Sequence, residues 1–488
     1  MSAARSFLDR DAWRGRFYSG GWREAQHSQD IAEPASGTVL SRVGVAAPAD
    51  IARAAQLASA AQPAWAALNF EQRAGVFRTA ARLAQEHSDE IIDWIMRETG
   101  AIRPKGQFEL QMTIRCLYEA GAMPSQPQGL MLPSLDGRLS FCRRMPLGVV
   151  GVITPFNFPL YLSVRALAPA LAVGNTVVLK PDLRTPVVGG FILARLFEAA
   201  GLPAEALHVL PGGADAGEAL CTDANVAMIQ FTGSSATGRR VGELAGRSLK
   251  KISLELGGKN ALVVLDDADL DLAVSNAAWG AYLHQGQICM AAGRVLVQRA
   301  LAQAFVERMA AKARQLPVGD PATAQVALGP LISERQRDRA HAIVQDSVKA
   351  GARLVTGGTY ERLFYQPTVL ADVAPGMRVF EEEIFAPVVA VTAFDTDAEA
   401  VELANRTAYG LSAAVISRSV ERALSLGNQL HTGLLHVNDQ TVNDEGINPF
   451  GGRGQSGNGT NIGGPANWDE FTQWQWVTVK DSATRYPL

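Results

Sequence analysis

The side chains best suited to covalent chemistry are a cysteine and a glutamate in unusual surroundings. Cys289 lies in the glycine-containing stretch 286–291, and Glu255 lies among apolar residues at 253–258. A cysteine in an irregular loop can direct its sulfur into a pocket, and partial burial raises the pKa of a carboxyl towards that of a general base. Together they predict a thiolate nucleophile beside a base, which suits acyl chemistry. The alternatives are an inert hydrophobic cysteine and an edge-strand glutamate that faces water.

An asparagine between two prolines is a candidate oxyanion donor. Asn157 stands between Pro155 and Pro159, directly after the apolar run 147–153. The prolines fix the turn and leave Asn157 at the carboxyl end of a predicted strand, where its amide could donate a hydrogen bond to an oxyanion. The alternative is an asparagine that only forms the turn.

A glycine-containing turn is the strongest local signal for a bound ligand. The stretch 231–238 follows a predicted strand and opens a predicted helix. Glycine lets the backbone approach a ligand, and the amides of a helix N-terminus attract phosphate. The stretch is not a GxGxxG fingerprint and lacks GK[ST], which excludes a P-loop; a tight turn without a ligand is the alternative. Lys180, at the end of another predicted strand, is a second candidate contact.

The elements that would position these residues begin with helices. The predicted helices are Ile51–Ala61, Phe70–Gln85 and Asp89–Arg97, with Asp50 and Ser88 as N-caps and Gly100 as a stop. The stretch Gly121–Arg138 is rich in proline and glycine and breaks this pattern. It could be a linker or an extended arm.

From residue 147 onward, short apolar runs alternate with helical stretches. The predicted strands are 147–153, 176–179, 207–210, 228–231, 252–255, 262–265, 295–297, 387–393, 413–416 and 434–437. The predicted helices are 191–200, 217–222, 235–245, 270–283, 300–314 and 398–405. Strands that are apolar throughout and alternate with helices indicate a parallel sheet covered on both faces. The pattern therefore predicts two α/β units in series.

Composition excludes several classes of protein. The chain has 488 residues, 47% hydrophobic and 19% charged, as in a globular enzyme of two or three domains. Its 45 basic and 48 acidic residues give a net charge of −3, so we expect neither nucleic acid nor an anionic membrane as a partner. No apolar run reaches the roughly 20 residues of a membrane span.

The four cysteines are widely spaced, at Cys116, Cys142, Cys221 and Cys289. They show no CxxC or cysteine–histidine spacing, so neither a disulfide framework nor a metal site is predicted. The segment Met1–Asp11 lacks the apolar centre of a signal peptide. We therefore expect a cytoplasmic protein.

Taken in order along the chain, these segments resemble those of the NAD(P)-dependent aldehyde dehydrogenase superfamily. The motifs that carry the resemblance are Pro155-Phe156-Asn157-Phe158-Pro159, Lys180-Pro181, Phe231-Thr232-Gly233-Ser234, Glu255-Leu256-Gly257-Gly258, Gly286-Gln287-Ile288-Cys289, Glu383-Ile384-Phe385 and Pro449-Phe450-Gly451-Gly452. Within the superfamily the chain is most similar to bacterial benzaldehyde dehydrogenases of aromatic catabolism. The segments behind this closer resemblance are Gly100–Gly106, Ala278–Gly280, His284–Gln287 and Phe471–Gln473.

The resemblance implies an α/β fold with a Rossmann-like cofactor domain, a catalytic α/β domain and a small β arm that joins subunits. We expect the cofactor-binding domain at 1–125 and 147–256, the catalytic domain at 257–475 and the arm at 126–146 and 476–488, with a strand near Trp476–Lys480. A homodimer or a homotetramer follows from such an arm.

The resemblance also implies a mechanism. Cys289 is the nucleophile, Glu255 activates the hydrolytic water, and Asn157 forms the oxyanion hole with the backbone N–H of Cys289. The aldehyde would form a thiohemiacetal on the sulfur, transfer a hydride to the nicotinamide, and leave a thioester that water hydrolyses to the carboxylic acid.

The implied cofactor is NAD, with NADP as an alternative. The implied cofactor residues are Ile153, Thr154, Pro155, Phe156, Lys180, Gly213, Phe231, Thr232, Gly233, Ser234, Gly238, Leu256, Glu383 and Phe385. Lys180 would bind the adenosine ribose, and Gly233 and Ser234 would lie at the pyrophosphate. Glu383 would hold the nicotinamide ribose, with Phe385 packed beside the nicotinamide.

Two departures from the pattern of the family bear on these roles. Leu183 replaces a glutamate that would bond the ribose hydroxyls and repel a 2′-phosphate, and its neighbour Arg184 could tolerate NADP; NAD stays favoured. Gln473 replaces the glutamate of a Thr-Glu pair near the C-terminal end. Because Gln473 cannot act as a base, that role falls on Glu255.

The implied substrate tunnel is apolar and aromatic, which suits a planar hydrophobic aldehyde such as benzaldehyde. The residues aligned with it are Phe158, Tyr161, Leu162, Arg165, Ile288, Met290 and Phe450. If Arg165 faces the tunnel, it could instead bind a carboxylate or a phenolic oxygen. Core packing is the alternative for each of these side chains.

Other activities would share part of this pattern. Broader-specificity or semialdehyde dehydrogenases share the motifs. A CoA-acylating dehydrogenase usually lacks the base that Glu255 supplies, a structural protein on this fold would be expected to have lost Cys289 or Glu255, and a cysteine hydrolase would not need the cofactor motifs.

Overall fold

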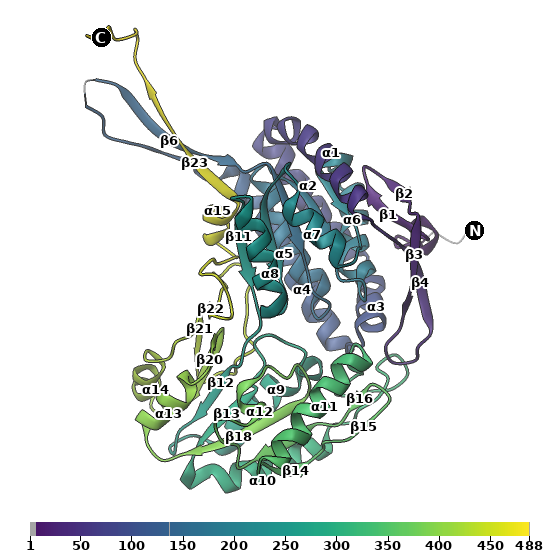
Figure 1. Cartoon of the computed structure of the whole chain (residues 1–488), viewed down its shortest axis with the longest axis vertical. Helices are drawn as coiled ribbons and strands as arrows, with labels where there is room; N and C mark the ends of the chain where they lie inside the picture. The colour runs from purple at the N-terminus through teal and green to yellow at the C-terminus, as the bar shows by residue number, and fades with distance from the viewer. Residues whose placement is uncertain (1–5, 136, 488) are drawn as a thin grey trace.

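The computed structural model describes residues 6–135 and 137–487, and it consists of two α/β bodies and a projecting β arm (Figure 1). Residues 1–5 of the predicted N-terminal segment, and 136 and 488 of the predicted arm, lie outside the described residues. The predicted fold class is confirmed, because each body contains a seven-stranded sheet covered by helices.

The first sheet holds its strands in the order β11-β10-β7-β8-β9-β1-β2. Its strands are β1 (Arg16–Ser19), β2 (Trp22–Glu24), β7 (Val149–Ile153), β8 (Thr176–Lys180), β9 (Leu207–Val209), β10 (Val226–Thr232) and β11 (Lys251–Glu255). The five strands from β7 to β11 are parallel, as their continuous apolar sequences predicted, and β1 pairs antiparallel with β9.

The strand order creates a crevice at the carboxyl edge of this sheet. The chain passes from β7 outward to β8 and β9, then crosses back to place β10 on the other side of β7. In open α/β sheets, ligands bind outside the carboxyl ends of the strands at such a switch point. The turns after β7 and β10 therefore define a binding crevice.

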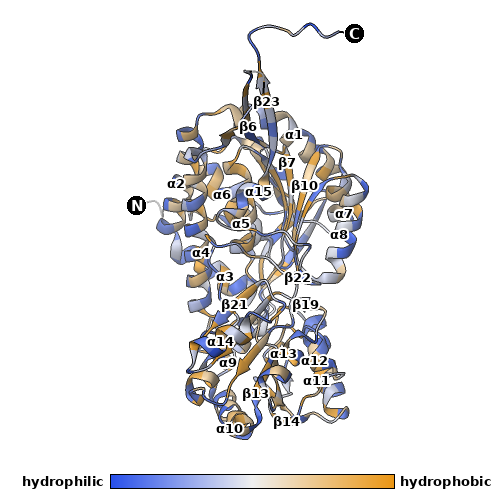
Figure 2. Ribbon diagram, turned by 90° about the vertical axis from the view of Figure 1, so that its left-hand side faces the viewer, coloured by the Kyte–Doolittle hydropathy of each residue, from blue (hydrophilic) through white to orange (hydrophobic). Residues whose placement is uncertain are grey.

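Two hydrophobic clusters cover opposite faces of this sheet, because successive strand residues point to opposite sides. The helices on one face are α1 (Pro48–Ala67), α7 (Ala214–Thr222) and α8 (Ser235–Arg247). Those of the other are α2 (Phe70–Glu86), α3 (Ser88–Thr99), α4 (Arg103–Ala122), α5 (Pro159–Ala172) and α6 (Ile192–Ala199). Figure 2 shows the apolar strands β7 and β10 between these helices.

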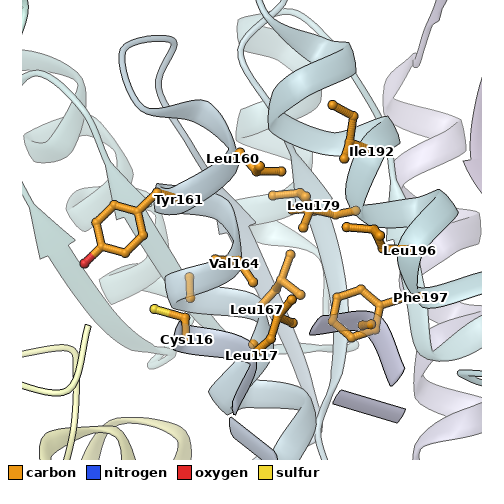
Figure 3. Close-up of a cluster of buried hydrophobic side chains, with 14 of the residues drawn as sticks. Cys116, Leu117, Leu160, Tyr161, Val164, Leu167, Leu179, Ile192, Leu196 and Phe197 are labelled. Carbon is orange, nitrogen blue, oxygen red and sulfur yellow. The ribbon is translucent and has the colours of Figure 1, made fainter. Parts of the chain in front are cut away.

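Helix α5 is packed between the sheet, α4 and α6. Leu160, Val164 and Leu167 of α5 are buried against Leu117 of α4, and the side chains of β8 and α6 lie on their other side (Figure 3). The residues of this cluster are fully or nearly fully excluded from solvent. The position of α5 is therefore fixed by its apolar contacts with both neighbours.

Helix ends were predicted less well than helix bodies. Asp50 is not the N-cap of α1: the helix begins at Pro48, and Asp50 accepts a hydrogen bond from the backbone N–H of Ala47 at 2.9 Å. Ser88 is the first residue of α3 and not its cap. Gly100 does end α3, with a left-handed φ of 71° that favours glycine. Helices α4 and α5 were not predicted, because their prolines look like breaks; Pro104 and Pro159 lie in the first turns, where proline is tolerated, and Pro169 lies inside α5.

The second sheet has the order β14-β17-β18-β13-β12-β20-β21. Its strands are β12 (Ala261–Val264), β13 (Arg294–Gln298), β14 (Arg353–Thr356), β17 (Thr368–Ala371), β18 (Val388–Phe394), β20 (Ser412–Ile416) and β21 (Leu434–Val437). All are parallel except β14, so the second predicted α/β unit is present.

Helices cover both faces of the second sheet as well. They are α9 (Leu270–Tyr282) and α10 (Arg299–Gln315) on one face, and α11 (Glu334–Lys349), α12 (Arg378–Glu381), α13 (Asp397–Asn405) and α14 (Val420–Gly427) on the other. Short pairs β15 (Tyr360–Glu361) with β16 (Phe364–Tyr365), and β19 (Tyr409–Gly410) with β22 (Arg453–Gly454), lie outside it. No helix in the described part of the chain is long and apolar enough to cross a bilayer.

The projecting arm is a three-stranded sheet in the order β23-β6-β5 (Figure 1). Its strands are β5 (Gly129–Met131), β6 (Leu139–Pro146) and β23 (Thr472–Val479), so the Gly121–Arg138 stretch belongs partly to an arm. Strand β23 starts at Thr472 and not near Trp476. The short helix α15 (Ala466–Phe471) precedes it and packs on α5 of the first body. A second hairpin joins β3 (His27–Ala32) to β4 (Val39–Val45).

Candidate active site

A largely apolar cavity lies between the two bodies and contains the residues with predicted chemistry. Its lining is Phe108, Asn157, Phe158, Tyr161, Leu162, Arg165, Gln230, Thr232, Glu255, Leu256, Ile288, Cys289, Met290, Val442, Asp444, Phe450 and Ile462. The structure thus brings together all three predicted catalytic residues and all seven predicted substrate residues. Segments separated by up to 354 residues, from Phe108 to Ile462, meet in this one cavity.

Cys289 is carried by the loop between α9 and β13 and opens onto the cavity. The residue is half-buried, unlike the fully buried Cys221. Two hydrogen bonds from Asn260 Nδ2 fix its loop, to the carbonyl oxygens of Cys289 at 2.8 Å and Ala291 at 2.9 Å. Burial raises the pKa of the Cys289 thiol, and the charges of Glu383, Asp444 and Glu255 raise it further. The thiol therefore needs a base to become a nucleophile.

Glu255 ends β11 and points into the cavity. Although β11 is an edge strand, the residue is only 3% exposed, which rules out a glutamate facing water. Neither carboxylate oxygen has a hydrogen-bond partner among the described residues. Burial raises the pKa of Glu255 well above its usual range; the Arg165 charge opposes this shift and Asp444 adds to it. An unpartnered carboxyl of this kind is suited to accept and release a proton.

Asn157 follows β7 in the turn that leads into α5, and it is 3% exposed. Its Nδ2 donates to the carbonyl oxygen of Gln287 at 2.9 Å, two residues before Cys289. The side chain therefore reaches across to the loop of the nucleophile, and its role is not limited to forming a local turn. A second N–H on the same nitrogen is available for a ligand oxygen.

Arg165 faces the cavity but is neutralised there. Its guanidinium pairs with Asp444 and also donates to the Tyr161 hydroxyl at 3.0 Å, and the Tyr161 hydroxyl donates to Asp444 at 2.9 Å. The guanidinium also lies 4.7 Å from the centre of the Phe450 ring. With a carboxylate already bound, Arg165 presents no net charge to a substrate.

The predicted cofactor residues gather at the carboxyl edge of the first sheet. Ile153, at the end of β7, pairs with Lys180 of β8 and with Phe231 of β10. Thr232 lies opposite Glu255, and Leu256 follows it. Gly213 is the N-cap of α7. The same helix contacts Lys180, because a Cβ added at Gly217 would lie 3.6 Å from the lysine side chain.

The turn after β10 forms a cradle for an anion. Ser234 is the N-cap of the thirteen-residue helix α8. A Cβ on Gly233 would come within 2.5 Å of the Phe231 ring, and one on Gly238 within 2.5 Å of Leu256. Only glycine leaves room here, and the N-terminal amides of α8 favour a phosphate. These residues fit the pyrophosphate of a dinucleotide.

Glu383 and Phe385 reach the crevice from the second body. The backbone N–H of Gly258 donates to Glu383 at 3.2 Å, and burial raises the pKa of Glu383 to about 7. Phe385, which has a left-handed φ of 58°, packs edge to face on Phe156 at 5.8 Å. An acidic side chain beside Gly257 and Gly258, together with an aromatic pair, fits a ribose and a flat ring.

The turn after β8 contains a charge pair that the sequence did not reveal. Arg184 makes two hydrogen bonds to Asp182, at 2.8 Å and 2.6 Å, and lies 4.1 Å from the centre of the Phe156 ring. Leu183 offers only its carbonyl oxygen, to Gln29. Because Asp182 neutralises Arg184, a 2′-phosphate would gain little from this arginine.

Five lining residues were missed by reasoning from the sequence. They are Phe108, Gln230, Val442, Asp444 and Ile462. Gln230 could have been found, since it is a polar residue inside the apolar run 228–231. Asp444 gave no local signal, because its importance comes from a partner almost three hundred residues away.

Comparison with known sequences assigns the family. The sequence model of the aldehyde dehydrogenase family matches residues 22–477, so the chain belongs to that family, as the resemblance predicted.

The curated relatives and solved structures that it resembles include enzymes named for aromatic aldehydes. The chain is 54% identical to a vanillin dehydrogenase of Amycolatopsis sp. and 48% identical to an NAD(+) benzaldehyde dehydrogenase of Pseudomonas putida, in each case over 99% of this chain and 100% of the relative. The crystal structure of a salicylaldehyde dehydrogenase from Pseudomonas putida G7 with salicylaldehyde matches at 33% identity and a TM-score of 0.93, covering 97% and 99% of the two chains.

The raised pKa of Glu255 predicts a pH-dependent stability. In the unfolded chain this carboxyl ionises near its usual value of 4.5, whereas in the fold it ionises at higher pH. The folded state therefore binds more protons, and the contribution of Glu255 to stability is lost as pH rises from about 4.5 through the folded pKa. Glu255→Gln removes this loss, and we expect its melting temperature to exceed that of the wild type by about 2 °C or more at pH 9.

Melting curves at pH 5 and pH 9 measure the effect. The difference between variant and wild type should grow with pH, while Glu307→Gln on the exposed surface of α10 should show no such growth. Glu98, Glu383 and Glu470, whose pKa values burial also raises, titrate in both proteins and cancel. A pH-independent difference would contradict the assignment.

Proposed function

We propose that this chain oxidises aromatic aldehydes to carboxylic acids with NAD⁺. The observation that carries the proposal is the joint presence of Cys289, Glu255 and Asn157 in one mostly apolar cavity, which Thr232 at the end of β10 also lines. The names of the relatives, which act on vanillin, benzaldehyde and salicylaldehyde, support the substrate class, and the NAD(+) benzaldehyde dehydrogenase supports the cofactor.

In the first half of the reaction, Cys289 Sγ bonds to the aldehyde carbon. The thiol proton passes to the ionised Glu255 carboxylate, and the pKa that burial raises makes this carboxylate a stronger base. The substrate oxygen becomes an oxyanion, and Asn157 Nδ2 with the Cys289 N–H would stabilise it. Loss of one such donor typically lowers the rate by about 10²–10³-fold.

Bound NAD⁺ would accept the hydride whose departure converts the thiohemiacetal to a thioester. Lys180, the α8 cradle at Gly233 and Ser234, and Glu383 would hold it. The neutralised Arg184 supports NAD⁺ over NADP⁺, because only a free cation would gain from the extra phosphate.

In the second half, Glu255 first releases the thiol proton to solvent, and it then removes a proton from the water that attacks the thioester. The acid leaves, and the sulfur regains its proton. This step needs Glu255 in its ionised form, so the acyl-enzyme should break down faster as pH rises through the raised pKa of this residue.

We further propose that the arm joins copies of this chain into a homodimer or homotetramer. Leu130, Met131 and Trp476 on its strands are 58%, 72% and 70% exposed, which is unusual for an isolated surface. The domain limits 1–125 with 147–256, and 257–475, are proposed with it. A cytoplasmic location fits the four cysteines, which are free thiols in the part of the chain that the structure describes.

Replacing the nucleophile tests the chemistry most directly. Cys289→Ala should abolish NADH formation from benzaldehyde and leave NAD⁺ binding intact, because the sulfur forms the covalent bond but does not build the cofactor crevice. Initial rates at 340 nm and a calorimetric titration with NAD⁺ measure the two effects. Cys142→Ala, on the arm, is the matched control and should retain activity; retained activity in Cys289→Ala would refute the mechanism.

Removing the base should separate the two halves of the reaction. Glu255→Gln is expected to slow thioester hydrolysis by about 10²-fold or more and hydride transfer by less. A stopped-flow trace should then show a burst of NADH of about one equivalent per site followed by a slow steady state. A normal steady state without a burst would count against the role of Glu255.

The charge pair in the cavity predicts substrate choice. Because Asp444 occupies Arg165, we expect kcat/KM for benzaldehyde to exceed that for 4-carboxybenzaldehyde by about 10²-fold, as burial of an unpaired charge is unfavourable. Asp444→Asn leaves the Arg165 charge free to bind the substrate carboxylate, and it should lower this ratio of kcat/KM values by about 10-fold. A panel of both aldehydes with both enzymes gives the ratio; an unchanged ratio would mean that Arg165 does not face the substrate.

A further inference from the structure

A buried ion pair lies directly behind the turn that carries Asn157. Lys105 and Glu109, one helical turn apart on α4, have side chains that are 0% exposed and are paired with each other. Neither lines the cavity, and neither touches the reacting groups. A fully buried pair is expensive to maintain, so its contacts with the site need an explanation.

The pair contacts the turn at Asn157 and Phe158 and at the first residues of α5. Lys105 Nζ donates to the carbonyl oxygen of Asn157 at 2.8 Å and lies 4.1 Å from the centre of the Phe158 ring. Glu109 accepts hydrogen bonds from the backbone N–H of Leu160 at 2.8 Å and of Tyr161 at 3.3 Å. Glu109 therefore satisfies free amides at the start of α5, where the helix dipole favours a negative charge.

The sheet does not hold this turn. Regular pairing of β7 ends at Ile153, and Thr154 makes the last backbone bond of that edge, to Lys180 at 3.2 Å. From Pro155 to Phe158 the chain is irregular, and Pro155 has no backbone N–H to donate. Contacts from outside the sheet must then set where the amide of Asn157 lies.

The helix that carries the pair is packed into the buried core. Figure 3 shows Cys116 and Leu117 of α4 facing the Val164 and Leu167 side of α5, one part of the buried cluster. The ring of His284 packs edge to face on Phe158 at 5.6 Å. Burial, followed by the nearby Lys105 charge, lowers the pKa of His284 well below its usual range, so the ring is neutral. The ion pair therefore has no competing charge from this histidine.

We propose that Lys105 and Glu109 are positioning residues that hold Asn157 at the oxyanion, Lys105 through the main chain of Asn157 and Glu109 through the start of α5. This inference rests on the proposed oxyanion role of Asn157. A displacement of about 1 Å in a catalytic group can lower a rate by about 10²-fold, so a pair that never contacts substrate can still govern turnover.

A double-mutant cycle tests this coupling. The rate of hydride transfer from benzaldehyde is measured by stopped flow at saturating NAD⁺ for wild type, Lys105→Met, Asn157→Ala and the combination. We expect Asn157→Ala to lower the rate by about 10²-fold and Lys105→Met by about 10-fold. In the Asn157→Ala background, Lys105→Met should cost less than about 2-fold, because residues that act through one another are not additive.

The outcomes separate the two proposals. Equal losses from Lys105→Met in both backgrounds would overturn the positioning role and leave that of Asn157 standing. No loss in Asn157→Ala would refute the oxyanion role itself. The KM for NAD⁺ should stay within about 2-fold of the wild-type value in every variant. A general loss of structure would change this KM by more.

Two further variants control for a loss of activity that is caused by misfolding. Lys105→Met with Glu109→Gln removes both charges, and the glutamine oxygen can still accept from Leu160; it should fold and show the same loss as Lys105→Met. Full activity in that variant would overturn the proposal. Arg103→Met removes a basic side chain of the same helix from its exposed pair with Asp89 and should leave the rate unchanged.

Discussion

The site depends on an unpartnered carboxylate that is kept out of water. Glu255 is buried in a cavity where the other charged side chains are paired with each other: Arg165 with Asp444 at the lining, and Lys105 with Glu109 behind it. A buried charge without a partner is unfavourable, so Glu255 gains from taking up a proton. The fold maintains this unfavourable group, and the chemistry of a thiol with a raised pKa requires it.

The two bodies supply different parts of that chemistry. The first contributes the carboxylate and the amide from the ends of β11 and β7, and the second contributes the sulfur from the loop before β13. The contact between Asn157 and the Gln287 carbonyl, and that between Gly258 and Glu383, join them. Proton transfer, oxyanion binding and the approach of the cofactor therefore depend on one interface within the chain, where a small displacement alters all three.

Prediction from the sequence was strongest where a physical rule acts locally. Apolar strands such as 176–179 and 228–231 were located to within a few residues, because a strand buried on both faces leaves no polar position. The left-handed turn at Gly100 was also found. Helices α4 and α5 were missed because their prolines resemble breaks. The predicted N-caps of α1 and α3 were wrong by three residues and by one, since the caps are Ala47 and His87.

The sequence by itself determined the parallel sheets, the motifs of the family and the residue types able to act as nucleophile, base and donor. These follow from periodicity and from side-chain chemistry, which are properties of short segments. Only the tertiary structure decided that Glu255 has no hydrogen-bond partner among the residues that the structure describes, and that Asp444 neutralises Arg165. It also decided that Asp182 holds Arg184, and that Lys105 and Glu109 lie behind Asn157. Burial and pairing of charges arise between segments far apart in the chain, so no local pattern contains them.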